Sequence, residues 1–384
     1  MTKPVKDNQM ALQREFQHFM LKEIYEQPES IGRGVAQYVA SLGSSAPSFH
    51  ALPEANCFEE IQILACGTSL HAALVGQFVL EQVAQIPTRV RSASEFLAAP
   101  LPVTRQTLLI VVSQSGETAD VLAAMRLANQ QSSSGLAGFK VFAITNNSHS
   151  AIAQQADYER SVGAGVENSV AATKTFTAQL VLFYGLALAW GRQRDRIPDE
   201  QWVTWQSRMA ALPSQVDQVL QQDDSIAAIA RSLKHTNHII LLGTGINYPI
   251  ALEGALKLKE TTYTHAEGYA AGEFLHGSIA LLDHTIPTIA LCPTPPFRSD
   301  PSLENPPSEG GDQMLKVTQR IRRNGSDVIA IGGSEAAIAL PLCDQLLSPF
   351  LTVIPLQLLA YHLAIARNIE VDRPRNITKS LNSF

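Results

Sequence analysis

The sequence predicts an α/β protein built from two consecutive copies of one parallel-sheet unit, each with helices on both faces of its sheet. Two observations carry this prediction. Short apolar runs typical of buried strands alternate with longer helical segments, which is the order of elements in a parallel sheet. Much of this order recurs about 178 residues later, and 384 residues are enough for two such domains.

The first copy is expected at residues 51–210. Its strands are expected at 61–65, 108–112 and 141–145, which are mostly apolar, and at 88–92, which is mostly polar. Longer apolar segments at 70–83 and 179–190 are expected to be helices that cover this sheet.

The second copy is expected at residues 211–366, with the polar stretch 214–224 as the joint. The run Ile239-Ile-Leu-Leu-Gly-Thr-Gly245 matches residues 63–68, and a helix is expected at 251–262. Further strands are expected at 286–291 and 328–331.

The segments outside the two copies have different compositions. Residues 1–50 are expected to form a helical arm, because Phe16, Phe19, Met20 and Ile24 recur at helical spacing. The proline-rich residues 293–312 are expected to be a mobile surface loop. Residues 367–384 form a polar tail, which by composition alone is typical of a frayed end.

Charge and cysteine usage limit the class of protein. The formal net charge is −6 at pH 7 without a long basic run, which argues against nucleic acid. The four cysteines form no CxxC pair, so we expect a reducing compartment and neither disulfides nor structural zinc. The N-terminus lacks a signal-peptide core, and no apolar run reaches membrane-spanning length. We therefore expect a cytoplasmic protein without membrane contact.

Residues 113–120, Ser-Gln-Ser-Gly-Glu-Thr-Ala-Asp, directly follow the apolar run 108–112. Where this strand ends and a helix begins near Thr118, the hydroxyls of Ser113, Ser115 and Thr118 meet free backbone N–H groups, which favours an anion. Gly116 allows a close turn around a ligand. No Gly-Lys-Ser/Thr follows, so the loop predicts a small phosphorylated metabolite rather than a nucleotide. An ordinary serine-rich turn with a capping hydroxyl is the alternative.

The second copy has Cys292-Pro-Thr-Pro-Pro296 at the corresponding place and lacks these hydroxyls. We therefore expect one phosphate site per chain, in the first copy.

Residues 253–277 concentrate titratable side chains. Lys257 and Glu260 share one helix face, where a surface ion pair is the ordinary alternative. His265, Glu267 and His276 follow in a stretch rich in small residues. The spacing of His265 and Glu267 matches no standard zinc set. Proton transfer fits better, because a carboxylate can move a proton between adjacent sugar carbons and a histidine can open the ring.

Several stretches together resemble one enzyme family. They are Lys22-Glu-Ile-Tyr-Glu-Gln-Pro28, Ala65-Cys-Gly-Thr-Ser69, Ser94-Glu-Phe96, residues 113–120, Ala171-Ala-Thr-Lys174, Tyr248 to Glu260, His265-Ala-Glu267, His276-Gly277, and Pro374-Arg-Asn376 with Lys379. The chain resembles the isomerase half of glutamine–fructose-6-phosphate amidotransferases (glucosamine-6-phosphate synthases). That half consists of two sugar isomerase (SIS) domains, each a flavodoxin-like parallel sheet.

The resemblance implies a phosphorylated hexose or hexosamine as substrate and a pocket in the first domain. The residues that would hold the 6-phosphate and neighbouring hydroxyls are Thr68, Ser69, Ser113, Gln114, Ser115 and Thr118. Val170 and Ala172 would line the sugar pocket.

The resemblance also implies the reacting groups. Glu260 would move a proton between C1 and C2, and Lys257 would support the enolamine or enediol charge. His276 would open the ring from the neighbouring subunit of a homodimer. Lys379 would form a Schiff base with the open ketose, which makes the tail a lid over the active site. No metal and no organic cofactor is implied.

Departures from the synthase pattern guide the choice of reaction. The glutaminase half needs an N-terminal cysteine, and the first cysteine here is Cys57, so we expect no glutamine hydrolysis by this chain alone. Ala172 stands where synthases have serine, and Leu275 where they have lysine; both resemble SIS-type glucosamine-6-phosphate deaminases. The leading hypothesis is deamination of glucosamine 6-phosphate to fructose 6-phosphate and ammonia, with the sugar epimer open.

Two alternatives remain. A glucosamine-6-phosphate synthase module would run the same chemistry toward synthesis, with free ammonia or a separate glutaminase. A non-catalytic sugar-phosphate sensor, as SIS units provide in some regulators, is the other. No basic DNA-reading module precedes the first copy, and a sensor has no need of Lys257, Glu260, His276 and Lys379.

Overall fold

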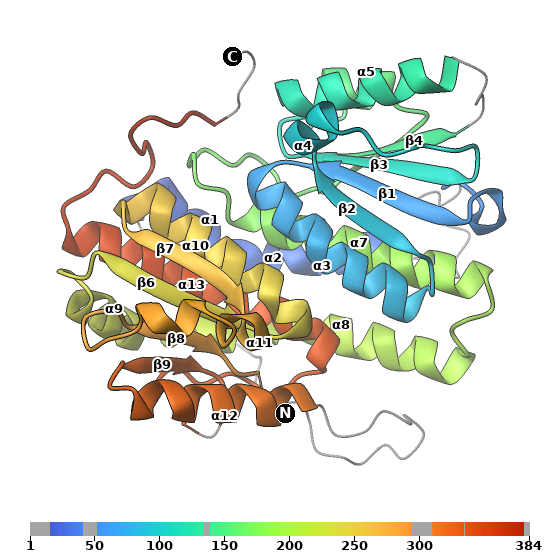
Figure 1. Cartoon of the computed structure of the whole chain (residues 1–384). Helices are drawn as coiled ribbons and strands as arrows, with labels where there is room; N and C mark the ends of the chain where they lie inside the picture. The colour runs from blue at the N-terminus through green and yellow to red at the C-terminus, as the bar shows by residue number, and fades with distance from the viewer. Residues whose placement is uncertain (1–15, 41–51, 134–138, 294–308, 334, 380–384) are drawn as a thin grey trace, which may run out of the picture.

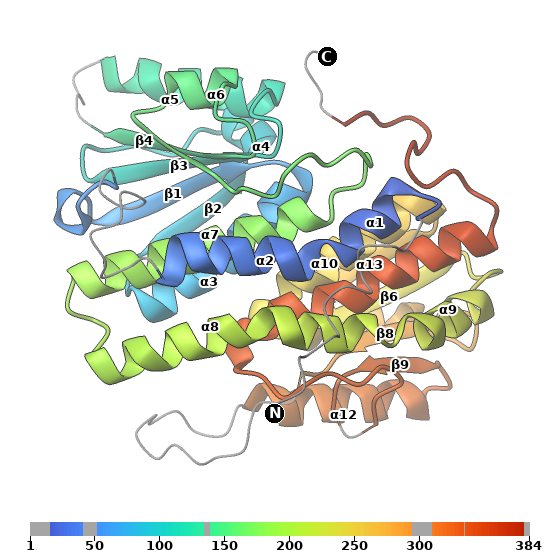
Figure 2. The same cartoon turned by 180° about the vertical axis from the view of Figure 1, so that it is seen from behind.

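The computed structural model describes residues 16–40, 52–133, 139–293, 309–333 and 335–379, and these form two parallel sheets with helices on both faces (Figures 1 and 2). The expected α/β class is thereby confirmed. Most of the expected loop 293–312 lies outside the described residues, as do parts of the expected arm and tail.

The first sheet is parallel, with the strand order β2-β1-β3-β4-β5. Its strands are β1 (Glu60–Ala65), β2 (Thr88–Ser92), β3 (Thr107–Ser113), β4 (Lys140–Thr145) and β5 (Tyr158–Ser161). The first four confirm the expected strands. The sequence did not predict β5, because the polar run Tyr158–Ser161 forms a half-buried edge strand without apolar alternation.

Both faces of this sheet are buried, which explains the continuous apolar runs of its strands. Ile61, Ile63 and Ala65 of β1 pack on the face covered by α3 (Gly67–Val83) and α7 (Lys174–Gln193). Leu64 packs on the opposite face, which α4 (Ala93–Ala98), α5 (Ala119–Ser133) and α6 (Ala151–Gln155) cover.

The register aligns the carboxyl ends of the central strands. Ala65 of β1 lies opposite Val112 of β3, and Ser113 lies opposite Thr145 of β4. The strand order changes direction between β1 and β3, and ligands of such sheets bind at that edge. Residues 66–69, where α3 begins, and residues 113–118, at the end of β3, therefore lie side by side at this edge.

The second sheet has the equivalent order β7-β6-β8-β9, which supports the internal repeat. Its strands are β6 (His238–Gly243), β7 (His265–Ala270), β8 (Thr288–Leu291) and β9 (Val328–Ile331). Its helices are α9 (Asp223–Ser232), α10 (Tyr248–Thr262), α11 (Ala271–Phe274), α12 (Glu309–Arg323) and α13 (Ser348–Ala366). Short 3₁₀ turns lie at Ala55–Cys57, Gly245–Asn247, Ser278–Leu281 and Gln345–Leu347.

Helix α8 (Asp199–Leu220) runs through the expected boundary at residue 210. We propose that the two sheets are the cores of the two expected domains. The division then falls at Gln221 and Gln222, between α8 and α9 and inside the expected joint.

Helix α13 corrects the expectation that no apolar segment reaches membrane-spanning length. Residues Gln345–Ala366 have a mean hydropathy of 1.6 over the most apolar part, enough by length and composition to cross a membrane. However, 83% of that window is buried inside the structure, where α13 packs against α8, α9 and α10. A helix that is apolar on all sides is equally typical of a protein core.

The expected arm is helical where the structure describes it. It comprises α1 (Phe19–Tyr25), α2 (Gln27–Val35) and a π-helical turn (Ala36–Ala40), and it packs against α7, α8 and α13 (Figure 2). The tail is tied to this arm, because both carboxylate oxygens of Asp372 accept the N–H groups of Phe19 and Met20 at 2.8 Å. The prediction of a frayed tail is therefore wrong at Asp372.

Candidate active site

The loop after β3 folds its hydroxyls together. The hydroxyls of Ser113 and Thr118 lie 2.8 Å apart, and the Gly116 N–H donates to the Ser113 oxygen at 3.0 Å. Gly116 has a φ of +69°, and a Cβ there would lie 1.9 Å from the Ser150 hydroxyl. This position therefore requires glycine. Helix α5 begins at Ala119, so the loop lies at a helix N-terminus as predicted.

Two further expected residues, Ser69 on α3 and Gln114 in the loop itself, complete this part of the site. Ser69, in the first turn of α3, is 8% exposed and accepts a hydrogen bond from the Gln179 side chain at 2.9 Å. Its own O–H therefore stays available to donate to an anion. Gln114 is half-buried, and its carbonyl accepts the N–H of Asn146 at 3.0 Å.

Helix α10 carries a buried ion cluster. The Lys257 ammonium lies 2.6 Å from Glu260 and 3.4 Å from Glu253, and it donates to the Thr68 hydroxyl at 3.1 Å. The side chains of Lys257 and Glu253 are 1% and 0% exposed. The surface ion pair considered from the sequence is therefore wrong. Thr68 in turn donates to Glu253, so its hydroxyl is engaged by this cluster.

Lys257 and Glu253 favour each other's charged forms. Burial alone would lower the pKa of Lys257, but the carboxylates of Glu253, Glu260 and Glu167 together raise that pKa above its ordinary value. Burial raises the pKa of Glu253, yet Lys257, His71 and Thr68 outweigh it and the net pKa is lowered. Lys257 is consequently a fixed cation.

Glu260 is the accessible member of the cluster, with 21% of its side chain exposed. Its carboxylate is held by the ammonium on one side and can meet a ligand on the other. A carboxylate next to a fixed cation can take up a proton while the cation stabilises the negative charge that develops.

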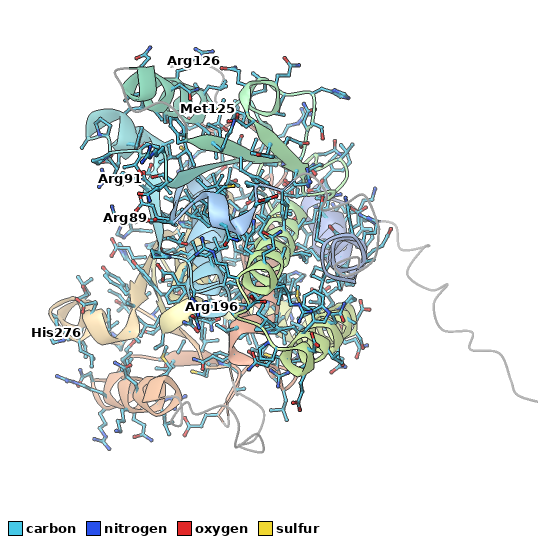
Figure 3. All side chains as sticks on the ribbon, turned by 90° about the vertical axis from the view of Figure 1, so that its right-hand side faces the viewer. Arg89, Arg91, Met125, Arg126, Arg196 and His276 are labelled. Carbon is cyan, nitrogen blue, oxygen red and sulfur yellow. The ribbon has the colours of Figure 1, made fainter. Side chains whose placement is uncertain are left out.

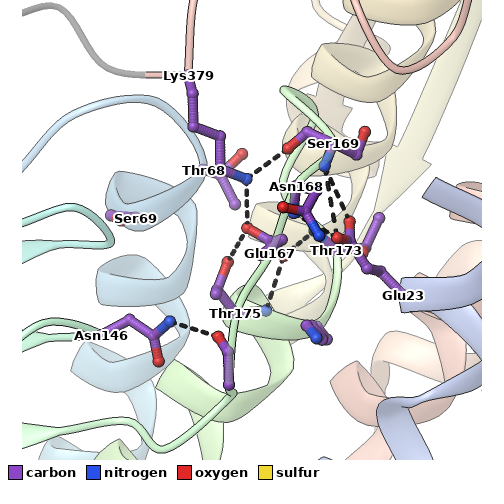
Figure 4. A network of polar contacts seen from close by, with 12 residues as sticks. Glu23, Thr68, Ser69, Asn146, Glu167, Asn168, Ser169, Thr173, Thr175 and Lys379 are labelled. Atoms are coloured by element: carbon purple, nitrogen blue, oxygen red, sulfur yellow. Dashed lines mark hydrogen bonds and ion pairs between the residues drawn. The ribbon is translucent and has the colours of Figure 1, made fainter. Parts of the chain in front are cut away.

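The tail lysine is held by the loop before α7. The Lys379 ammonium donates to Glu167 at 2.7 Å and to the Ser169 carbonyl (Figure 4). The Glu167 carboxylate also accepts N–H groups from Thr173 and Thr175 at 3.0 and 3.1 Å. The charge of Glu167 also contributes, after Glu253 and Glu260, to raising the pKa of Lys257.

Val170 and Ala172 follow in the same loop, and both are half-buried. The Val170 N–H donates to the carbonyl of Asp372 at 3.1 Å, which fixes this loop to the tail.

The chain does not bring every expected residue together. His276 follows α11 on the surface and projects away from the body (Figure 3). None of the hydrogen bonds and ion pairs between described residues joins its side chain to Glu260. His265 and Glu267 lie 3.5 Å apart on the exposed edge strand β7. No group of three or more metal-binding side chains occurs in the described ranges.

Five residues in or beside the site were not predicted: His71, Glu167, Gln179, Glu253 and Glu23, whose carboxylate on α1 accepts the N–H group of Asn168. Only Glu253 had a local signal, because it precedes Lys257 by one helical turn. His71 contacts it at 2.7 Å from a helix far away in the sequence.

Comparisons with known proteins agree on the family. The model of the SIS domain family matches residues 56–189 and 232–295. The glutamine–fructose-6-phosphate aminotransferase (isomerizing) of Thermosynechococcus vestitus is 43% identical over 97% of this chain, and that of Chlorobaculum tepidum is 40% identical over 95%. The chain spans about 60% of the length of these relatives (60% and 58%).

Solved structures are also similar. The C-terminal domain of glucosamine-fructose-6-phosphate aminotransferase from Francisella tularensis is 33% identical, with a TM-score of 0.82 over 94% of this chain and 99% of that one. A glucosamine-6-phosphate deaminase from Thermotoga maritima has a TM-score of 0.74 over 94% of this chain and 99% of that one. At 22% identity, the latter likeness shows the fold alone.

Proposed function

We propose, from the premise that this chain belongs to the SIS domain family, that it is an amino-sugar phosphate isomerase that converts fructose 6-phosphate and ammonia into glucosamine 6-phosphate. One observation carries the proposal: the partly exposed Glu260 carboxylate lies 2.6 Å from a buried, permanently charged lysine. Aldose–ketose isomerisation moves a proton between adjacent carbons, which needs a base, and a nearby cation stabilises the negative charge that develops.

The phosphosugar would bind at the edge between β1 and β3. Ser69, Ser113, Ser115 and Thr118 would donate their hydroxyls to the 6-phosphate, with Thr68 and Gln114 beside them. Val170 and Ala172 would line the sugar pocket. The helix N-termini of α3 and α5 favour the negative charge of the phosphate.

The chemistry would then proceed in three steps. His276, contributed by a second subunit of a homodimer, would open the sugar ring. Lys379 would leave Glu167 and attack the C2 carbonyl of fructose 6-phosphate, and loss of water would give an imine. Ammonia would then replace the lysine at C2, which leaves a C2 imine of ammonia and frees Lys379. Glu260 would take a proton from C1 and return it to C2, which yields the aldehyde at C1 and the amine at C2. Lys257 would stabilise the enolamine between the two transfers.

The direction of the reaction is supported by the relatives named above, which are aminotransferases at 40% and 43% identity. Ammonia would come from solution or from a glutaminase. Deamination, the hypothesis placed first from the sequence, is the second candidate. Ala172 and Leu275 favour it, because they replace the serine and lysine of the synthase pattern.

The assay tests both directions on the purified chain, in buffer with a reductant that keeps its cysteines as thiols. One arm supplies fructose 6-phosphate with ammonium and measures glucosamine 6-phosphate. The other supplies glucosamine 6-phosphate and measures ammonia and fructose 6-phosphate. Glu260→Gln should abolish both, whereas Glu81→Gln on the exposed face of α3 should not.

Net deamination without synthesis would favour the second candidate. A folded protein that binds fructose 6-phosphate in calorimetry but is silent in both assays would contradict the proposed enzyme and indicate a sensor.

A further inference from the structure

A buried carboxylate of the arm is aimed at the site without touching its reacting groups. Glu23 of α1 is 1% exposed. Its carboxylate accepts the backbone N–H groups of Asn168 and Ser169, and the bonds to Ser169 measure 3.3 and 3.4 Å (Figure 4).

The segment 167–169 is therefore held from two sides. Glu23 binds its backbone N–H groups, while the Glu167 carboxylate and the Ser169 carbonyl bind the Lys379 ammonium. A shift of these three residues would move both acceptors of Lys379 at once. The position of the lysine thus depends on a carboxylate that it does not contact.

A second connection ties the same helix to the tail. Asp372 accepts the first N–H groups of α1 with its side chain, and its carbonyl accepts the Val170 N–H. Helix α1, the loop 167–170 and the tail from Asp372 to Lys379 together form what we term the arm–tail clasp.

Burying the Glu23 carboxylate costs free energy, because a charged group is removed from water. Burial raises its pKa to about 7, although the Asn168 N–H opposes this shift. An apolar side chain would fill the same place without desolvating a charge. Departures of this kind from the ordinary preference for an apolar buried side chain are expected mainly at functional sites.

We propose that Glu23 is a positioning residue for Lys379: it fixes segment 167–169 and thereby holds the lysine at the site until the ketose arrives. The inference rests on the proposed function, which gives Lys379 its partner in the reaction. It extends that function by making the arm part of the active site.

The test compares Glu23→Gln with Glu29→Gln, an exposed glutamate of α2 whose loss should be neutral. Two readouts need no substrate. At pH 8, where the Glu23 carboxylate is ionised, hydrogen exchange of the peptide spanning 167–170 should accelerate about tenfold or more in Glu23→Gln, because a charged hydrogen-bond acceptor is replaced by a neutral one. Acetylation of Lys379, followed by peptide mass spectrometry relative to exposed Lys140, should also accelerate.

Two further readouts use fructose 6-phosphate. Reductive trapping of the sugar on Lys379 with cyanoborohydride should slow about tenfold, and kcat should fall by a similar factor with little change in KM. Asp372→Asn, which weakens the clasp from the other end, should act in the same direction. This second variant keeps the proposal testable if Glu23→Gln folds poorly.

The outcomes separate the two proposals. If the wild type neither turns over nor is trapped, the proposed function is wrong, while exchange and acetylation still test the clasp. If exchange and acetylation are equal in Glu23→Gln and Glu29→Gln, the positioning role is wrong. If they change but trapping and kcat do not, Glu23 has a structural role only and the proposal fails.

Discussion

The Lys257 ammonium donates a hydrogen bond to the Thr68 hydroxyl over 3.1 Å, across the junction of the two sheets. Thr68 lies on α3, which follows β1, and Lys257 lies on α10, which follows β6. Equivalent helices of the two repeats therefore face each other, and each contributes to one polar cluster. The first repeat carries the hydroxyl loop and the second carries the ion cluster on α10, so each repeat contributes a different part of the candidate site.

Lys257→Met should remove the cation and leave Glu253 buried without its main partner. We expect a loss of about 3–5 kcal/mol in the free energy of unfolding, together with loss of turnover. Urea unfolding measures the first effect. In the double variant Glu253→Gln/Lys257→Met most of the stability should return while activity stays absent. Equal stabilities of wild type and Lys257→Met would contradict a charged buried cluster.

Gly116→Ala should damage the hydroxyl loop by two effects. The positive φ strains any other residue by about 1–2 kcal/mol, and the added Cβ would meet the Ser150 hydroxyl. We expect a large rise in KM for fructose 6-phosphate with a smaller change in kcat. Gly165→Ala is the matched control, because its φ of +73° is similar but nothing lies within 4 Å of its Cβ. Similar KM values in both variants would argue against a phosphate site here.

The pKa of Glu23 predicts a pH-dependent stability. The pKa of Glu23 is raised from 4.5 to about 7. Between pH 4.5 and pH 7 the Glu23 side chain is therefore protonated in the folded state and ionised in the unfolded state. Stability from this group is therefore present at low pH and falls as pH rises toward 7. The charged groups that act on it are Glu167, Lys379 and Lys174.

The glutamine of Glu23→Gln does not titrate, so this pH dependence is absent from the variant. Its free energy of unfolding relative to wild type should therefore rise by up to about 3 kcal/mol between about pH 5 and pH 8. Urea unfolding of both proteins across this range measures the difference. Parallel pH profiles would mean that the Glu23 pKa is ordinary.

Mixed dimers test where His276 acts. When subunits with His276→Ala and Glu260→Gln are co-expressed, a mixed dimer of the proposed kind regains one intact site from two inactive parents. Statistical pairing then predicts about one quarter of the wild-type activity. If the mixed dimers are as inactive as the two parent proteins, His276 either acts in the active site of its own subunit or takes no part in the reaction.

The sequence predicted those parts of the candidate site whose residues lie close together along the chain. The loop 113–118 and the pair Lys257–Glu260 follow from strand, turn and helix patterns within a few residues. The contact between Glu167 and Lys379 joins residues far apart in the sequence, and Glu23 acts through backbone N–H groups that any residue possesses, so no residue pattern predicts either. Strand β7 was missed because His265–Ala270 contains glycine and no β-branched residue, and its pairing with β6 is a tertiary effect.

Helix α13 has a consequence for dividing this chain into pieces. Its apolar surface is covered by α8 and α1 from the earlier part of the sequence as well as by α9 and α10. A fragment that begins at α9 would keep the whole second sheet but expose the part of α13 that α1 and α8 cover. We expect such a fragment to aggregate or to bind a complementary fragment. We therefore expect that neither repeat folds on its own, because α13 of the second repeat packs against α1 and α8, which precede that repeat in the sequence.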